Sequence, residues 1–380
     1  MLNAERAVRI ALEKVGLEVN GKNPWDPQMK SSDVFAGILA RGSIGLGEAY
    51  MQGRWECEDL VEFFARITGG GVSKAVSLTP ANVLLFIRSV LTNRQSKGQA
   101  LSLGRFHYDI PQEVWEGTLD SRMTGSCAYY RTGAETLDEA QEAKIDLTLR
   151  KADIGPGKSL LDIGVGWGAF SGYAAGKYSA RPIGVTVSDS QREYIRQRYG
   201  DAVDVRVHDY RDTKLSNSVD AVISAEMFEH VGSDNFRTFF EVAHRSLRPE
   251  GRMVLHTIVS HTPSKHIDPW MDKYIYPGGC LPTPGQICSA VHGLFHVEDV
   301  HDIGAHYDRT LIAWMSRFEE HWVNVKALGK KKLGMDPEVF CRMWKYHYLA
   351  SAGGFRSRTI SVHQYVLSRR GISGGLPPIR

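Results

Sequence analysis

The chain has 380 residues, of which 42% are hydrophobic and 10% aromatic. This length and composition exclude a disordered chain, and they are sufficient to bury a core without disulfide or metal staples. The 46 Lys and Arg residues nearly balance the 43 Asp and Glu residues, which leaves a formal net charge of +3. So balanced a charge argues against a nucleic-acid-binding protein, and we expect no nucleic-acid partner.

The five cysteines include no CxxC pair. We therefore expect neither a disulfide framework nor a Cys-rich zinc site, and no bound metal. No apolar run approaches the ~20 residues that a membrane-spanning helix needs. Charged residues such as Glu5, Arg6 and Arg9 interrupt the N-terminal segment, so no signal peptide is expected. These features predict a cytoplasmic globular enzyme.

The N-terminal quarter of the chain carries two helical patterns, near residues 4–15 and 60–67. Between them, residues 41–55 hold four glycines and are predicted to form turns or a compact β-element.

A polar, Gly-containing stretch around residues 96–104 is the best candidate for a linker between domains. It divides the chain into a smaller N-terminal domain, residues 1–95, and a larger catalytic domain, residues 105–380.

Beyond this linker, short apolar segments alternate with helical patterns. The expected strands are 159–164, 182–187, 203–207, 221–225 and 252–258, with a late strand pair at 296–303 and 359–367. Helices are expected from about residue 189 and over 234–247. Buried strands that alternate with helices predict an α/β fold, with a doubly wound, mostly parallel seven-stranded sheet.

A glycine-rich loop, DIGVGWG at residues 162–168, follows the first of these strands. Glycines let a backbone turn sharply and approach a ligand, and the helix that follows presents free N–H groups. Gly164 and Gly166 also fit the dinucleotide fingerprint, but Thr186 and Val187 stand where that motif expects an acidic residue. Asp162 instead favours S-adenosylmethionine. An ordinary strand-to-helix turn is the third interpretation.

Eight short strings, in the same order along the chain, resemble the cyclopropane-fatty-acyl-phospholipid synthase family. They are GSIGLGEAYMQGRWEC (42–57), HYD (107–109), SCAYY (126–130), LLDIGVGWG (160–168), MFEHVG (227–232), LHTI (255–258), DPWMDKYIYPGGCLP (268–282) and GAHYDRTL (304–311). The resemblance implies a Rossmann-like class I methyltransferase fold. It also implies a bacterial enzyme that transfers a methylene group from S-adenosylmethionine to the cis double bond of a phospholipid acyl chain.

The family uses bicarbonate as the general base, and the resemblance implies a site for it here. Cys127 and Ile258 would offer backbone groups to this anion, and Glu229, His256 and Tyr307 would offer side chains. Tyr108 would lie near the reacting centre, where its ring could favour a cation.

The positions that match the cofactor contacts of the family form a second set. They are Ser126, Asp162, Gly164, Gly166, Trp167, Thr186, Val187, Gln191, Asp209, Tyr210 and Arg211.

Three positions depart from the family pattern. Val165 stands where the family usually has Cys, Gly125 where it usually has Tyr, and Ser351 where it often has Cys. The first change is expected to have little effect, the second removes one aromatic wall of the site, and the third excludes a thiol nucleophile there.

The substrate implied by the resemblance requires contact with a membrane. We expect peripheral association with its inner face, acyl chains as partners, and a homodimer as one assembly that the N-terminal domain could form. Trp270, Met271, Tyr274, Ile275, Tyr276 and Leu281 either line an acyl-chain tunnel or pack as core. Lys326 and Lys330 to Lys332 either contact lipid headgroups or form a solvated loop.

Two other functions fit the sequence less well. One is an S-adenosylmethionine-dependent methyltransferase that acts on another unsaturated lipid, or on a small amine, without ring closure. The other is a non-catalytic lipid-binding protein with a degenerate cofactor site.

Overall fold

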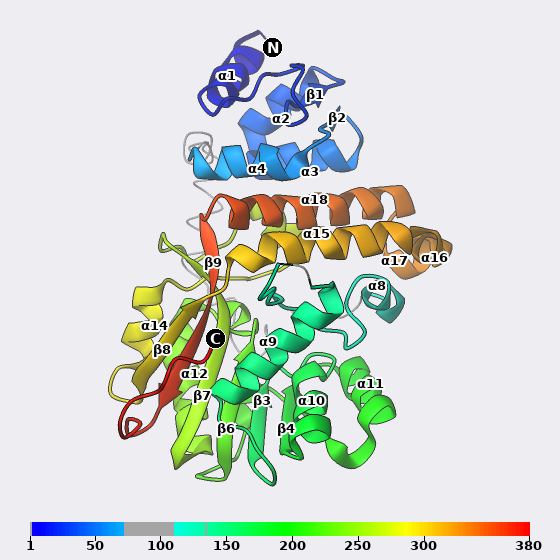
Figure 1. The fold of residues 1–380 in the computed structure, drawn as a ribbon. Coiled ribbons are helices and arrows are strands. Elements are labelled where there is room, and N and C mark those ends of the chain that lie inside the picture. Colours follow the sequence, from blue (N-terminus) through cyan, green and yellow to red (C-terminus); the bar gives the residue numbers. More distant parts are fainter. Residues whose placement is uncertain (1, 72–109, 134) are drawn as a thin grey trace.

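The computed structural model describes residues 2–71, 110–133 and 135–380. Three layers follow one another in Figure 1: the N-terminal helices, a pair of long helices, and a β-sheet flanked by further helices. The predicted linker, and with it Tyr108, falls outside the described residues. The division into two domains therefore stays a prediction.

The described residues form a seven-stranded sheet in the order β5-β4-β3-β6-β7-β9-β8. Its strands are β3 (Ser159–Ile163), β4 (Arg181–Thr186), β5 (Asp204–Val207), β6 (Val219–Ala225), β7 (Leu247–Ser260), β8 (His296–Asp302) and β9 (Ile360–Ser368). The first five pair in parallel, whereas β9 runs antiparallel to both β7 and β8. The predicted α/β fold, with its mostly parallel seven-stranded sheet, is confirmed.

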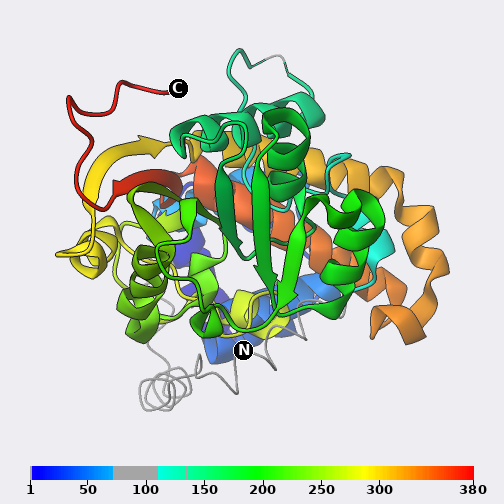
Figure 2. The same ribbon diagram turned by 90° about the horizontal axis from the view of Figure 1, so that it is seen from below.

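Helices cover both faces of this sheet, because its central strands are apolar on both sides. The helices that follow or precede these strands are α9 (Leu137–Lys151), α10 (Ala169–Tyr178), α11 (Asp189–Tyr199), α12 (Phe236–Ser246) and α14 (Pro284–Val291). Leu160 and Val254 face a cluster with α9 and α10, whereas their neighbours Leu161 and Leu255 face one with α12 and α14. Figure 2 shows these helices on opposite sides of the strands.

Two long helices, α15 (Ala305–Glu320) and α18 (Pro337–Arg356), lie side by side between the sheet and the N-terminal helices (Figure 1). Trp344, Tyr346 and Tyr348 of α18 are almost fully buried. Short segments complete the chain around this layer: β1 (Gln28–Met29), β2 (Trp55–Glu56), α8 (Gln112–Glu116), α13 (Pro269–Tyr274), α16 (Trp322–Ala327) and α17 (Gly329–Leu333). The aromatic side chains of α18 thus share one apolar core with α15 and the N-terminal helices.

The N-terminal layer consists of α1 (Leu2–Glu13), α2 (Asp33–Arg41), α3 (Ser43–Met51) and α4 (Leu60–Gly69). The helices predicted near residues 4–15 and 60–67 are confirmed as α1 and α4. Asp59 begins α4 by accepting a hydrogen bond from the backbone N–H of Glu62, a standard N-terminal cap.

The turns or compact β-element predicted for residues 41–55 are wrong, because most of this segment is helix α3, followed by the two-residue strand β2. Gly42 and Gly53 flank the helix with positive φ, as turn glycines do. The other two glycines serve close packing. A Cβ on Gly45 would lie 2.0 Å from the carbonyl oxygen of Gly37, and one on Gly47 would lie 2.4 Å from the Trp270 ring.

The lysine-rich segment is also helical, rather than the loop that was one of its two interpretations. Lys326 lies on α16 and Lys330 to Lys332 lie on α17. Lys326 pairs with Glu338 and Lys332 with Glu113, so two of the four charges are met by exposed carboxylates.

The close contact at Gly45 predicts the cost of adding a single methyl group. Gly45→Ala should lower the free energy of unfolding by about 1–3 kcal/mol, because the atom it meets is backbone and cannot rotate away. Urea unfolding measures this change. Gly155→Ala is the control, since nothing lies within 4 Å of its added Cβ and its stability should be unchanged within about 0.5 kcal/mol. Equal stabilities of the two variants would contradict the packing argument.

Candidate active site

The glycine loop lies at the carboxyl end of β3, next to the point where the strand order reverses between β3 and β6. Ligands bind at such points in doubly wound sheets. Gly164 and Gly166 have φ values of +87° and +55°. A Cβ on Gly164 would lie 2.6 Å from Met227, whereas one on Gly166 would enter open space. The loop thus turns against the segment after β6 and exposes its backbone at Gly166.

Asp162 links the two elements on either side of this loop. Its carboxylate is buried and accepts a hydrogen bond of 2.8 Å from the hydroxyl of Ser171 on α10. Burial raises the pKa of Asp162 to about 7. The side chain therefore ties the end of β3 to the start of α10 and fixes the two ends of the loop between them.

A mainly apolar cavity of about 750 Å³ opens beside the loop. Five of the expected cofactor residues line it: Ser126, Gly164, Gly166, Trp167 and Gln191. Trp167 packs edge-on against Tyr194, with ring centroids 5.2 Å apart. A nucleotide-like ligand that lay along this wall would meet free backbone, a hydroxyl and an amide, so the residues present fit S-adenosylmethionine.

Asp162 and the other expected cofactor residues, which lie at or after the ends of the next two strands, do not line the cavity. The Thr186 hydroxyl donates to the side-chain oxygen of Gln191 at 2.7 Å, which fixes the amide that does face the cavity. The Asp209 carboxylate is held by the guanidinium of Arg211, 2.8 Å from its Nε, and the Tyr210 ring packs on Phe239. Val187 lies directly after β4.

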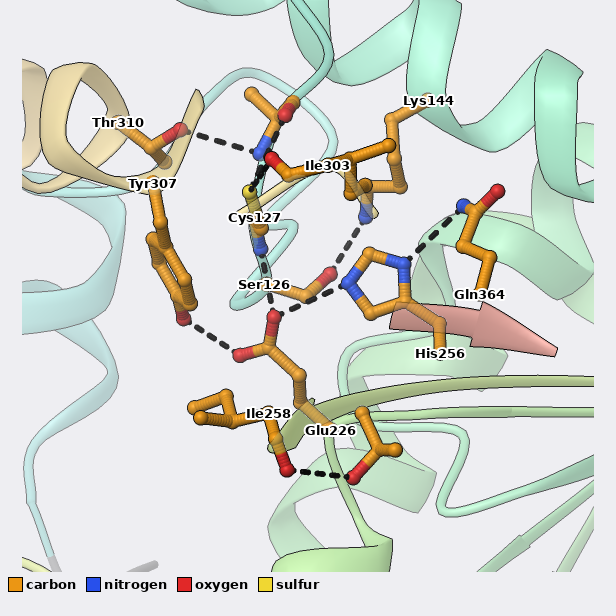
Figure 3. Close-up of polar contacts among 12 residues, drawn as sticks. Ser126, Cys127, Lys144, Glu226, His256, Ile258, Ile303, Tyr307, Thr310 and Gln364 are labelled. Atoms are coloured by element: carbon orange, nitrogen blue, oxygen red, sulfur yellow. Dashed lines mark hydrogen bonds and ion pairs between the residues drawn. The ribbon is translucent and has the colours of Figure 1, made fainter. Parts of the chain in front are cut away.

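A carboxylate that sequence reasoning missed, Glu226, occupies the centre of the expected bicarbonate site (Figure 3). One of its oxygens accepts from the backbone N–H of Cys127 at 2.9 Å and lies 3.1 Å from Nε2 of His256. The other accepts from the Tyr307 hydroxyl at 2.5 Å. Three of the five groups expected to hold an external anion are thus bound to an anion that belongs to the chain.

His256 is placed so that its Nε2 carries the proton. Its ring is fully buried on β7, and Nε2 of Gln364 on β9 lies 3.2 Å from Nδ1. Because an amide nitrogen can only donate, Nδ1 accepts and Nε2–H points at Glu226. Burial lowers the pKa of His256, which favours this neutral form. His256 is therefore a hydrogen-bond donor to the carboxylate rather than a cation beside it.

Glu229 and Ile258, expected at the same anion, bind each other instead. The backbone N–H of Ile258 and the hydroxyl of Thr257 both donate to Oε1 of Glu229. Oε2 has no hydrogen-bond partner among the described residues, and the side chain faces the cavity. Burial, and then the charge of Glu226, raise the pKa of Glu229. Glu229 is therefore the neutral member of this pair of carboxyl groups.

A buried cation, Lys144, lies on the far side of the site and was also missed. Its ammonium donates to the Ser126 hydroxyl at 2.5 Å and lies 4.4 Å from the centre of the Phe170 ring. Burial lowers its pKa to about 8, against the charges of Glu226 and Asp120, which favour the charged form. The lysine thereby balances the negative charge of Glu226 in a region of low dielectric constant.

Glu226 could have been suspected from its place directly after a central strand, but two glutamates follow β6 within four residues. Only the backbone conformation tells Glu226 apart from Glu229. Glu226 has a φ of +50°, a conformation that costs a non-glycine residue on the order of 1–2 kcal/mol. This strained turn aims its carboxylate at Cys127, while Glu229 continues into the short 3₁₀ helix Phe228–His230.

The same cavity continues from this site to the N-terminal layer. Its lining includes Leu12, Ile38 and Phe64 of the N-terminal helices. Gly125 and Ser351, two of the departures from the family pattern, also line it, and a Cβ on Gly125 would meet only Leu119, at 4.0 Å. The missing aromatic wall at Gly125 is thus open space.

The apolar stretch from Trp270 to Leu281 divides between its two interpretations. Met271, Tyr276 and Leu281 line the cavity, whereas the other three side chains do not. Trp270 is fully buried against Tyr346 of α18, with ring centroids 4.4 Å apart. Within the described parts of the chain, no group of three or more His, Cys, Asp or Glu side chains is placed to hold a metal ion.

The fold and the cavity at its switch point define a class I S-adenosylmethionine-dependent methyltransferase. The family model described as mycolic acid cyclopropane synthetase matches residues 95–365. The cyclopropane-fatty-acyl-phospholipid synthase of Escherichia coli K12 is 39% identical over 375 residues, which cover 98% of this chain and 95% of that protein. The chain therefore belongs to the cyclopropane synthase family of methyltransferases.

Other similar proteins agree with this placement. A tuberculostearic acid methyltransferase of Mycobacterium tuberculosis is 33% identical and covers 89% of this chain and 82% of its own length. The structure of the cyclopropane synthase MmaA2 from the same species aligns with a TM-score of 0.64, 30% identity, and 70% and 97% coverage of the two chains. That of the mycolic acid cyclopropane synthase CmaA1, complexed with S-adenosylhomocysteine (SAH) and CTAB, aligns with a TM-score of 0.63, 31% identity, and 70% and 97% coverage.

The raised pKa of Glu229 predicts a pH dependence of stability. Above the ordinary glutamate pKa of 4.5, the unfolded chain loses this proton while the folded chain keeps it, so the free energy of unfolding should fall as the pH rises. Glu229→Gln removes the titration but keeps the shape of the neutral acid. Its stability, measured by urea unfolding between about pH 5 and 8, should therefore fall less steeply with pH than that of the native chain.

Glu241→Gln is the control for this prediction, because Glu241 lies exposed on α12 and pairs with Arg237. Its stability should follow the native pH curve. An unchanged slope in Glu229→Gln would mean that Glu229 is ionised in the folded state.

Proposed function

We propose that this protein is a cyclopropane-fatty-acyl-phospholipid synthase. It would use S-adenosylmethionine to add a methylene group across the cis double bond of a phospholipid acyl chain. The observation that carries the proposal is one continuous cavity, which joins the glycine loop and Glu226 to an apolar space between α18 and the N-terminal helices. The 39% identity to the Escherichia coli synthase, over nearly the whole of both chains, supports the same substrate class.

The residues of the cavity fit the demands of this reaction. An alkene is a weak nucleophile, so catalysis rests on positioning and on stabilising the positive charge that develops on the lipid. When bound, S-adenosylmethionine supplies an electrophilic methyl carbon. Tyr307 and Trp314 line the cavity, pack edge to face with centroids 5.8 Å apart, and offer aromatic rings to a cation. Apolar walls on the N-terminal side would exclude water from the acyl chain.

Bicarbonate was the expected general base. The donors expected for it at Cys127, His256 and Tyr307 are already bound to Glu226, and a second anion would meet that carboxylate at close range. The residues present therefore do not fit bicarbonate at this place. The proposed activity is independent of this point, since any weak base suffices to deprotonate a carbocation.

We also propose that the protein works at the inner face of a membrane as a peripheral enzyme. Among the described helices, none is both long enough and apolar enough to cross a bilayer. Val323 on α16 is 78% exposed and lies near Lys326 in the sequence, with three more lysines on α17. An exposed apolar side chain beside lysines suits anionic headgroups, where a lysine contributes about 1 kcal/mol, although Lys326 and Lys332 would first have to leave Glu338 and Glu113. The homodimer expected from the N-terminal domain is a separate proposal, and light scattering would test it by measuring the molar mass in solution.

The activity predicts a defined product. Full-length protein incubated with S-adenosylmethionine and vesicles of a cis-unsaturated phospholipid should raise the acyl-chain mass by one CH₂ unit. NMR of the product should show cyclopropane protons and no new methyl branch. Vesicles of the saturated lipid are the control and should stay unmodified. A methyl branch in place of the ring would identify a methyltransferase without ring closure, and no product at all would refute the proposal.

The shared cavity predicts that the N-terminal layer takes part in chain selection. Ala11 lines the cavity, so Ala11→Trp should reduce turnover of longer acyl chains several-fold relative to shorter ones in a lipid mixture, because the indole shortens the available space. Ile10→Trp is the matched control, since Ile10 lies on the same helix and is 45% exposed. The same chain preference in both variants would show that this part of the cavity does not hold the acyl chain.

A further inference from the structure

We propose that the side-chain carboxylate of Glu226 is the general base of the reaction and takes the place of a bound anion. The proposal rests on the proposed function, because it assigns the proton that ring closure releases. Its basis is geometric. The backbone N–H of Cys127, Nε2–H of His256 and the hydroxyl of Tyr307 all converge on Glu226, at 2.9, 3.1 and 2.5 Å.

Glu226 can reach a substrate, since it lines the cavity together with Gly164, Met227 and Tyr307. Its side chain is only 8% exposed, so little water competes for the proton. In Figure 3 its carboxylate lies between Cys127, His256 and Tyr307, which come from three different parts of the chain. Glu226 and the glycine-loop residues Gly164 and Gly166 therefore line one cavity.

Glu226 and the neighbouring carboxyl group of Glu229 differ in their hydrogen bonds. It accepts three hydrogen bonds over both oxygens, whereas Oε2 of Glu229 has no partner in the described structure. The pKa of Glu229 is raised by burial and by the charge of Glu226, and the buried ammonium of Lys144 lies near enough to interact with Glu226. Two carboxyl groups in one dry site share a proton, and here Glu229 holds it.

The proposed step balances in atoms and charge. The π electrons of the alkene form a bond to the methyl carbon, while the carbon–sulfur bond breaks and leaves its electron pair on sulfur. The other alkene carbon is then electron-deficient. A C–H bond of the new methyl group breaks, its electron pair closes the ring, and the proton bonds to an oxygen of Glu226. Water takes this proton when the product leaves. A carboxylate is a weak base, which suffices because the cation is a very strong acid.

The backbone supplies a clean variant. Glu226 has a φ of +50°, a conformation that glycine adopts readily, so Glu226→Gly relieves the backbone strain at this turn and offsets part of the stability lost with the three hydrogen bonds. It also empties the space among the three donors. Glu226→Gln keeps that space filled with a group that cannot accept the proton. Asp153→Gly is the control, because Asp153 has a φ of +58° and pairs with Lys158 at an exposed site away from the cavity.

The experiment compares these four proteins in buffer freed of carbon dioxide and in the same buffer with added bicarbonate, on vesicles of a cis-unsaturated phospholipid. The native chain and Asp153→Gly should turn over equally in both buffers. Glu226→Gly should lose about 100-fold without bicarbonate, the scale of a general base, and recover at least 10-fold with it. Glu226→Gln should be equally slow in both. In carbon NMR, the signal of labelled bicarbonate should broaden with Glu226→Gly and stay sharp with the native chain.

The outcomes separate the two proposals. Ring formation by the native chain that depends on added bicarbonate, or full activity of Glu226→Gln or of Glu226→Gly without bicarbonate, overturns the role of Glu226 and leaves the proposed function intact. A native chain that binds S-adenosylmethionine but modifies no lipid in either buffer overturns the proposed function, and this inference with it.

Discussion

The packing of α18 between the sheet and the N-terminal helices is the constraint on which the rest of the molecule depends. A parallel sheet gathers the carboxyl ends of its strands at one edge, and that edge would be open to water if nothing covered it. Here α15 and α18 lie across it, and the buried rings of Trp344, Tyr346 and Tyr348 bind the N-terminal helices to the same core. The cover converts an open crevice into a cavity whose polar end is formed by strand ends and whose apolar end is formed by helices.

Enclosure of this kind imposes strict limits on charge. An ionised carboxylate in a dry site needs hydrogen bonds and a counter-charge, and the site provides three donors and the ammonium of Lys144. Burial and the nearby charge of Glu226 raise the pKa of Glu229, even though Ile258 and Thr257 donate hydrogen bonds to its Oε1. His256 is kept neutral by burial and by the donor at its Nδ1. Glu229 is thus the neutral carboxyl group, and the ammonium of Lys144 balances the charge of Glu226.

The sequence predicted the parts of this structure that follow from local pattern. Each predicted strand was found, since alternating apolar segments and helices leave little choice of topology. The nature of residues 41–55 was missed because a glycine that opens a turn and one that permits close helix packing look the same in a sequence, and Gly45 and Gly47 are of the second kind. At the site, the family resemblance located Cys127, His256 and Tyr307 but assigned their common partner to an external anion. The partner is Glu226, which only the positive φ at the end of β6 distinguishes from Glu229.

The strained turn at Glu226 replaces the free-energy cost of binding a free anion. A freely diffusing anion occupies its site in proportion to its concentration, and its binding must offset the loss of its translational freedom. A carboxylate attached to the chain is placed in its site when the protein folds. Its placement strains the backbone at Glu226 by on the order of 1–2 kcal/mol, and three hydrogen bonds offset this strain. In return, the base is present in every molecule and is held at a fixed position relative to the glycine loop. A tethered group reacts as though it were at very high local concentration, so a weak base can act within the short life of a carbocation.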